Sequence, residues 1–240
     1  MLTLVLTRHG LTDRSIPEQH LGQRIDISIN DAGRRQAEAL ADRLRGIRIE
    51  RVITSSLFRA RETAEIVAAH LALPAGTTVE VDPRLREMDY GAWEGRTYED
   101  LEATAAEERA AWVQRPDELR CPGGESGNDV AARMRAFLDD LLDEHRSWHA
   151  RAELRATTGT GPRTVPAERP VLAVGHSTTN RVLISVALGL PIREYRRRLV
   201  QGQGNLTVLR WEEGAAPEDA QLLLLNDLAH LRGAGEAPWG

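Results

Sequence analysis

The sequence predicts an α/β fold, a three-layer α/β/α sandwich with a mainly parallel central sheet. Short apolar segments rich in Val and Leu alternate with longer segments of helical periodicity, which is the order expected of a sheet covered by helices on both faces. Two apolar segments, residues 2–6 and 171–174, each lead to a histidine. Parallel strands bring their carboxyl ends to one edge of a sheet, where ligands bind. We therefore expect His9 and His176 to lie together at that edge.

Each expected strand is a short apolar run between turn-forming residues. In chain order we expect strands at residues 2–6, 51–53, 78–81, 171–174, 206–211 and 221–225. The last two follow each other without a long helical segment between them, so we expect them to form a final pair.

Helices are expected where apolar residues recur every three to four positions. In chain order they are expected at residues 31–44, about 57–71, 98–112, about 128–148 and about 178–188. Asn30 or Ser28 can cap the first of these, and Ser56 can cap the second, because their side-chain oxygens accept free backbone N–H groups. Gly46 and Pro74 follow the same two helices as stop signals.

The chain predicts a single domain over residues 1–240, because it contains neither an internal repeat nor a convincing boundary. Residues 150–169 include a stretch of Thr, Gly, Pro and Arg, and we expect a mobile surface insertion there. The Gly-rich residues 233–240 are expected to form a frayed tail.

Composition excludes several classes of function. A net charge of −5 gives no overall field for nucleic acid or anionic membranes, so neither is expected as a partner. All 31 basic residues are arginine, which excludes Schiff-base and P-loop lysines. Cys121 is the only cysteine, so no disulfide framework or Cys-based zinc site is possible. The sequence shows neither a signal peptide nor a membrane-length apolar run, and we expect a cytoplasmic protein.

The residues around His9 suit phosphoryl chemistry. A neutral imidazole is a competent nucleophile once the charge of the phosphate is balanced, and guanidinium groups balance it best. Arg8 is adjacent, and Arg59 falls in the first turn of a helix that follows a neighbouring strand. His176 could donate to an oxygen that gains charge in the transition state. Glu87 is the candidate acid for the leaving group, since apolar and aromatic neighbours favour a protonated carboxyl.

The chain resembles the histidine phosphatase superfamily, which includes the cofactor-dependent phosphoglycerate mutases. Leu6-Thr7-Arg8-His9-Gly10 looks like the Arg-His-Gly signature of that family. Further blocks follow in the family's order along nearly the whole chain, at Gly22 to Ala37, Thr54 to Ala64, Leu85 to Gly95, Gly123 to Ser126 and Val174 to His176. One block would be weak evidence, but the ordered set is specific. The resemblance implies a phosphoglycerate mutase-like fold in its phosphatase branch.

The resemblance also implies roles for single residues. His9 becomes phosphorylated, Arg8, Arg59 and His176 form the phosphate pocket, and Glu87 is the proton donor and then the base for water. The remaining expected phosphate or substrate ligands are Gly10, Thr12, Ser15, Gln23 and Ser177. Ser15 stands where many members have Asn, and Ser177-Thr178-Thr179 replaces a frequent small-residue run. No metal and no organic cofactor are implied.

Hydrolysis is preferred over mutase-type phosphoryl transfer. Mutases similar to this protein carry an Arg directly after the acid and a Lys in the following segment, where this chain has Met88 and Tyr98. A mutase must retain a bisphosphorylated intermediate and exclude water, which needs more cationic ligands than the sequence reveals. We expect a phosphatase that acts on a small phosphorylated metabolite, with phosphoglycerate mutase-type transfer as the alternative. The identity of the substrate stays open, as does the oligomeric state, for which a homodimer is one possibility.

Other functions have weaker support. A serine hydrolase using Ser177, with Asp227 and His230, lacks the last glycine of Gly-x-Ser-x-Gly. His145 and His149 are spaced for a metal on one helix face, but a solvated surface is the simpler interpretation. The run at residues 196–198 indicates a solvated face or the lining of a substrate loop. A non-catalytic binding protein on the same fold would require loss of a core site residue, and none is missing.

Overall fold

A six-stranded sheet forms the centre of the protein. The computed structural model describes residues 1–17, 19–159 and 168–232. The strands lie in the order β3-β2-β4-β1-β5-β6. Their bounds are Leu2–Arg8 (β1), Arg51–Thr54 (β2), Val79–Val81 (β3), Arg169–Gly175 (β4), Leu206–Trp211 (β5) and Gln221–Asp227 (β6). Only β5 runs antiparallel to its neighbours β1 and β6, so the predicted mainly parallel sheet is confirmed.

The pairing of β1 with β4 positions the two histidines. These strands are parallel, and Arg8 lies opposite Gly175 at the end of the ladder. The backbone N–H of His9 donates to Gly175 O at 3.0 Å, just beyond that pair. His9 and His176 therefore leave the same sheet edge side by side, as the sequence predicts.

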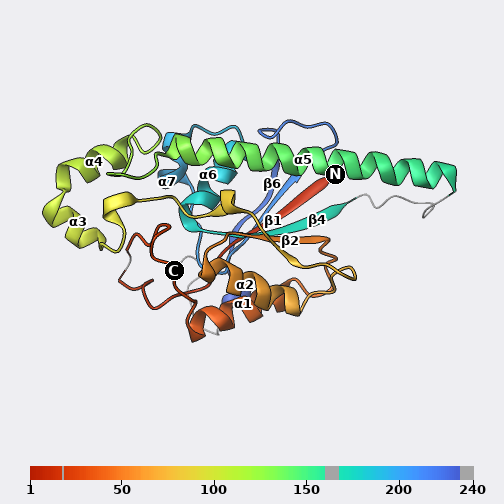
Figure 1. Ribbon diagram of the computed structural model, residues 1–240, viewed down its shortest axis with the longest axis horizontal. Helices are drawn as coiled ribbons and strands as arrows, with labels where there is room; N and C mark the ends of the chain where they lie inside the picture. Colours follow the sequence, from red (N-terminus) through yellow and green to blue (C-terminus); the bar gives the residue numbers. More distant parts are fainter. Residues whose placement is uncertain (18, 160–167, 233–240) are drawn as a thin grey trace.

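Helices cover both faces of the sheet, which confirms the three-layer sandwich (Figure 1). One layer holds α1 (Asp31–Arg43) and α2 (Phe58–Ala69), and the other holds α5 (Gly127–Thr158) and α6 (Ser177–Ala187). Smaller helices are α3 (Tyr98–Thr104), α4 (Ala106–Gln114) and α7 (Tyr195–Arg198), with 3₁₀ turns η1 (Pro83–Leu85), η2 (Gly91–Trp93), η3 (Ile192–Glu194) and η4 (Ala229–Leu231). No helix in the described ranges is long and apolar enough to cross a membrane.

Alternation along β1 divides the core into two clusters. Leu2, Leu4 and Leu6 pack with the buried side chains of α5 and α6. Val5 faces the opposite way and packs with the apolar faces of α1 and α2. Successive strand side chains point to opposite faces, so one apolar run supplies both cores. This burial on two sides fits the apolar character of residues 2–6, among which Thr3 is the one polar residue and is itself buried.

Several helix boundaries differ from the predicted ones. Asn30 caps α1 as expected, because its side chain accepts from Gly33 N. Ser56 is not the cap of α2; Leu57 occupies that position, and Asp26 Oδ1 accepts the N–H of Phe58 at 2.7 Å. The predicted helix at residues 98–112 is two helices, which meet at the non-helical Ala105.

The predicted mobile insertion at residues 150–169 is wrong for residues 150–158. These residues continue α5, which begins at a capping box formed by Ser126 and Asp129 and ends at the left-handed Gly159. Strong helix formers (Ala, Arg, Glu and Leu) fill residues 150–156 and propagate the helix. Residues 160–167 and the predicted tail at 233–240 lie outside the described residues.

Candidate active site

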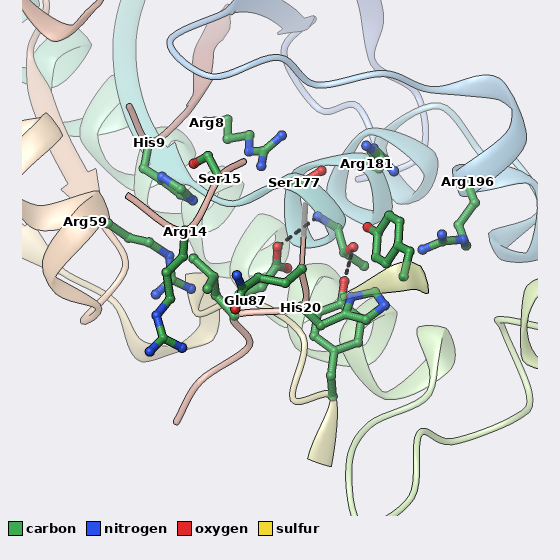
Figure 2. A pocket seen from close by; sticks show the side chains of 15 residues that line it. Arg8, His9, Arg14, Ser15, His20, Arg59, Glu87, Ser177, Arg181 and Arg196 are labelled. Carbon is green, nitrogen blue, oxygen red and sulfur yellow. Dashed lines mark hydrogen bonds between the residues drawn. The ribbon is translucent and has the colours of Figure 1, made fainter. Parts of the chain in front are cut away.

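His9 has the geometry of a nucleophile. Its Nδ1 lies 2.7 Å from the carbonyl oxygen of Gly10, which is the partner that fixes the proton on Nδ1 and leaves a lone pair on Nε2. The ring lines a pocket (Figure 2) and its centroid lies 5.1 Å from that of His176. Burial, with further contributions from Arg59 and Arg8, holds the pKa of His9 well below its usual range. The imidazole is therefore neutral at neutral pH.

His176 is the N-cap residue of α6 and is fully buried. Its Nε2 lies 2.8 Å from Ser55 Oγ at the end of β2. Its Nδ1 has no hydrogen-bond partner among the described residues. Burial, then the charges of Arg59 and nearby groups, lowers the pKa of His176 well below the usual value. A buried polar atom without a partner is costly, so Nδ1 is available to an oxygen of a ligand.

Arg8 and Arg59 line the same pocket as His9, and backbone carbonyls hold both guanidinium groups. Arg59 Nη1 donates to Ile25 O at 3.0 Å, and its Nη2 donates to Gly22 O at 2.7 Å. Arg8 Nη1 donates to Gln201 O at 3.0 Å. Neutral carbonyls thus orient these donors at the pocket, and guanidinium groups suit the oxygens of a phosphate.

Glu87 lies between η1 and η2, and its carboxylate contacts the amino end of α6. Oε1 accepts from Met88 N at 2.8 Å and from Thr179 N and Oγ1 at 3.2 Å each. Among the described residues, Oε2 accepts only from Thr178 N, at 3.2 Å. The carboxylate thus replaces a side-chain cap for α6. Since Oε2 has the fewer donors and Glu87 lines the pocket, Oε2 is the oxygen best able to carry a proton to a ligand.

The other predicted ligands divide into two groups. Ser15 and Ser177 line the pocket. The pocket lining does not include Gly10, Thr12 and Gln23, which instead contact residues near the pocket. A Cβ on Gly10 would lie 2.5 Å from Gly33 O, so the glycine permits close approach of β1's end to α1. Thr12 N donates to Ser15 Oγ at 3.0 Å, and Gln23 Nε2 donates to Glu87 O at 2.8 Å.

Two arginines of the pocket wall, Arg14 and Arg181, were missed by the sequence analysis, and a third, Arg196, was considered there only as part of a run. Arg14, Arg181 and Arg196 line the pocket together with Arg8 and Arg59, so the sequence-based estimate of cationic ligands was too low. The run at residues 196–198 is divided between the two interpretations offered for it. Arg197 and Arg198 pair with Glu194 on the exposed side, whereas Arg196 lines the pocket. The helical spacing of Arg181 from Ser177 was the available signal, because residues four apart share a helix face.

The alternative sites gain no support from the geometry. No hydrogen bond joins Ser177 Oγ to a histidine within the described ranges; His230 Nε2 instead lies 2.9 Å from Gly204 O. The rings of His145 and His149 lie 6.2 Å apart. Among the residues that the structure describes, no group of three His, Cys, Asp or Glu side chains could hold a metal ion.

A neutral histidine set among arginines at the carboxyl end of parallel strands defines an enzyme of phosphoryl transfer. The chain belongs to the histidine phosphatase superfamily (branch 1), whose pattern matches residues 4–227. This confirms the family and enzyme class that the sequence motifs predict.

Relatives with two kinds of names are similar to the chain. It is 34% identical over 197 residues to "Probable phosphoglycerate mutase GpmB" of Erwinia tasmaniensis, covering 82% of this chain and 80% of that protein. It is 33% identical over 215 residues to "Glucosyl-3-phosphoglycerate phosphatase" of Mycobacterium tuberculosis, covering 88% and 87%. A solved structure of mycobacterial glucosyl-3-phosphoglycerate phosphatase with inorganic phosphate superposes with a TM-score of 0.74 at 32% identity, covering 95% of this chain and 98% of that one.

Proposed function

We propose that this protein hydrolyses small phosphate monoesters through a covalent phosphohistidine on His9. The observation that carries the proposal is the neutral His9 ring, oriented by Gly10 O and lying 5.1 Å from His176 in a pocket that Arg8 and Arg59 also line. This set supplies a nucleophile and a cationic pocket for phosphate oxygens.

In the first step, His9 Nε2 attacks phosphorus and the bond from phosphorus to the ester oxygen breaks. Arg8 and Arg59 balance the charge of the phosphoryl oxygens, and the Nδ1–H of His176 donates a hydrogen bond to one of these oxygens. Glu87 Oε2 delivers its proton to the departing alkoxide, so the alcohol leaves neutral. The products of this step are the alcohol, phosphohistidine and the Glu87 carboxylate, which the N–H donors of α6 stabilise.

In the second step, the Glu87 carboxylate takes a proton from water as the water oxygen attacks phosphorus. The bond from phosphorus to His9 breaks, inorganic phosphate leaves, and His9 and protonated Glu87 are restored. One carboxyl group thus serves as acid and then as base, as the reversal of proton flow between the two steps requires.

Water is the proposed acceptor because the mutase-type ligands beside Glu87 are absent from their positions. Met88, directly after the acid, is fully buried in the core, and Tyr98 presents a phenol to the pocket instead of a lysine. Relatives named for phosphatase and for mutase activity resemble the chain almost equally, so the acceptor must be tested directly.

A panel of phosphorylated metabolites, including the phosphoglycerate esters named for the relatives, tests the proposal. The wild-type protein should release inorganic phosphate, and His9→Ala should release none above background. With 3-phosphoglycerate, nuclear magnetic resonance should detect free phosphate rather than 2-phosphoglycerate. Faster formation of the isomer than of phosphate would establish transfer and refute hydrolysis.

A further inference from the structure

The pocket has two cationic ends on opposite sides of Glu87. Figure 2 shows Arg8, His9 and Arg59 on one side of the view and Arg181 and Arg196 on the other. Glu87 and Ser177 lie between them. The first end is the phosphate pocket described above. The second end, which we call the outer subsite (Arg181 and Arg196 with the rings of His20 and Tyr98), has no role in the proposed chemistry.

Arg181 projects from α6 into the pocket. It follows Ser177 by four residues in that helix, so the two side chains lie on one face, and both line the pocket. Arg181 forms no ion pair with a carboxylate within the described ranges, and its Nε is buried without a hydrogen-bond partner there. The guanidinium is thus held at the wall with its charge uncompensated.

Arg196 reaches the same end from α7. Its guanidinium carbon lies 4.5 Å from the centroid of the Trp112 ring, and this aromatic contact orients the group without cancelling its charge. It also forms no ion pair with a described carboxylate, in contrast to Arg197 and Arg198 on the same short helix. Of the three consecutive arginines, Arg196 therefore lines the pocket, whereas Glu194 pairs with the other two.

No other described side chain of the outer subsite supplies negative charge. Among the described residues, Glu87 is the only carboxylate that lines the pocket, and backbone N–H groups of α6 donate to it. Burial and the charges of Arg196 and Arg109 lower the pKa of His20 to about 3, so this ring is neutral. Two uncompensated guanidinium groups in one concave site are the arrangement that binds a carboxylate or phosphate.

We propose that Arg181 and Arg196 bind a second anionic group of the substrate, a carboxylate or a phosphate on its alcohol part. The inference rests on the proposed function: Glu87 protonates the leaving oxygen, so the alcohol must extend from the phosphate pocket past Glu87. The outer subsite lies beyond Glu87 in that direction. Arg181 and Arg196 are therefore specificity-determining residues, and the substrates are phosphate monoesters that carry a second anionic group.

Matched substrates measure this preference. Glycerol 3-phosphate has a hydroxymethyl group where 3-phosphoglycerate has a carboxylate. In glycerol 1,3-bisphosphate a second phosphate is attached at the same position. The wild-type protein should show kcat/KM at least about 10-fold higher for one of these two esters with a second anionic group than for glycerol 3-phosphate. The larger of the two values identifies which anion the outer subsite prefers. Arg181→Gln and Arg196→Gln should each reduce this ratio by about 10- to 100-fold.

Arg197→Gln is the matched control, because Arg197 belongs to the same helix and is paired outside the pocket. It should leave both the ratio and the individual rates unchanged. The proposal is overturned if the wild-type ratio is near one. It is also overturned if the Arg181 and Arg196 variants reduce the rates for all three substrates equally.

Binding of unreactive phosphonates separates this proposal from the proposed function. By calorimetry, 3-phosphonopropanoate should bind at least about 10-fold more tightly than 3-hydroxypropylphosphonate, and the Arg181 and Arg196 variants should abolish the difference. Equal affinities refute the outer subsite and leave the phosphatase mechanism standing. The expected difference in a protein that hydrolyses none of the esters would support the outer subsite and refute the proposed function.

Discussion

The two ends of the pocket are built in different ways. At the phosphate end, backbone carbonyls orient Arg59 and Arg8, and adjacent parallel strands deliver both histidines. At the outer subsite, Arg181 and Arg196 come from two separate helices and rest on aromatic rings or on no partner among the described residues. The first end is fixed by the backbone, and the second by side chains alone. We infer that the strands of the sheet position the groups that react with the phosphate, and that the side chains of α6 and α7 determine which substrates bind.

The strongest test of this division is Glu87→Gln, which removes the proton but keeps the shape. We expect kcat/KM for alkyl phosphates to fall by about 10²- to 10⁴-fold, the usual contribution of a general acid. The loss should be much smaller for an aryl phosphate, because a phenolate leaves without protonation. Steady-state kinetics with both ester types measures it. Equal losses would show that Glu87 is not the leaving-group acid.

Arg59→Met tests whether the phosphate end contributes equally to the hydrolysis of every substrate. Removing a preorganised cation should lower kcat/KM by about 10²- to 10³-fold, to the same extent for esters with and without a second anionic group. The outer-subsite variants should instead discriminate between those esters. Arg61→Met is a suitable control, since Arg61 pairs with Glu65 on the exposed side of α2. A loss in Arg59→Met that is confined to esters with a second anionic group would contradict the distinction between the two ends.

Gly10→Ala tests whether the backbone fixes the phosphate end. A Cβ there would lie 2.5 Å from Gly33 O in the first turn of α1. Relieving this clash requires the backbone of α1 to move, which costs more free energy than rotation of a side chain. We expect the free energy of unfolding to fall by about 2 kcal/mol, together with a loss of activity. Gly202→Ala is the comparison, because its nearest neighbour is the flexible end of Leu228. Urea unfolding measures both, and equal stability of the two variants would contradict the account.

The acid stability of the protein probes the outer subsite. The pKa of His20 is about 3 in the folded protein and near 6.5 in the unfolded chain. The unfolded state therefore binds more protons between these values, and stability is lost as the pH falls below 6.5. At pH 5 this group alone should cost about 2 kcal/mol relative to pH 7 or above.

Urea unfolding of His20→Phe at pH 5 and pH 7 measures that contribution. The aromatic stack with Tyr90 is retained, and the drop in stability between the two pH values should shrink by about 2 kcal/mol. His70→Gln, at an exposed helix end, should leave the drop unchanged. An unchanged drop in His20→Phe would show that His20 is not buried as described.

Sequence analysis could predict the phosphate end because consecutive residues encode it. The apolar runs of β1 and β4 end directly at His9 and His176, so a strand pattern and a short motif specify both position and chemistry. The register of β1 on β4 then follows from parallel pairing. The same local character explains why the sheet and most helices agree with the expected ranges.

The outer subsite could not be predicted in this way. Arg181 and Arg196 are far from His9 in the sequence, and only the packing of α6 and α7 brings them to its pocket. Nothing local distinguishes Arg196 from Arg197; the difference is that Trp112 lies beneath one and Glu194 pairs with the other. The extension of α5 to Thr158 was missed for a related reason, since helix-forming residues outweighed the turn-like composition that begins beyond it.

The most direct test of the central claim is to trap the phosphorylated enzyme. Rapid mixing with a labelled phosphate ester, followed by denaturing quench and peptide mapping, should place an acid-labile label on His9. Glu87→Gln should accumulate more of this intermediate from an aryl phosphate, because water then lacks its base. Label on another residue, or normal turnover in His9→Ala, would contradict the mechanism.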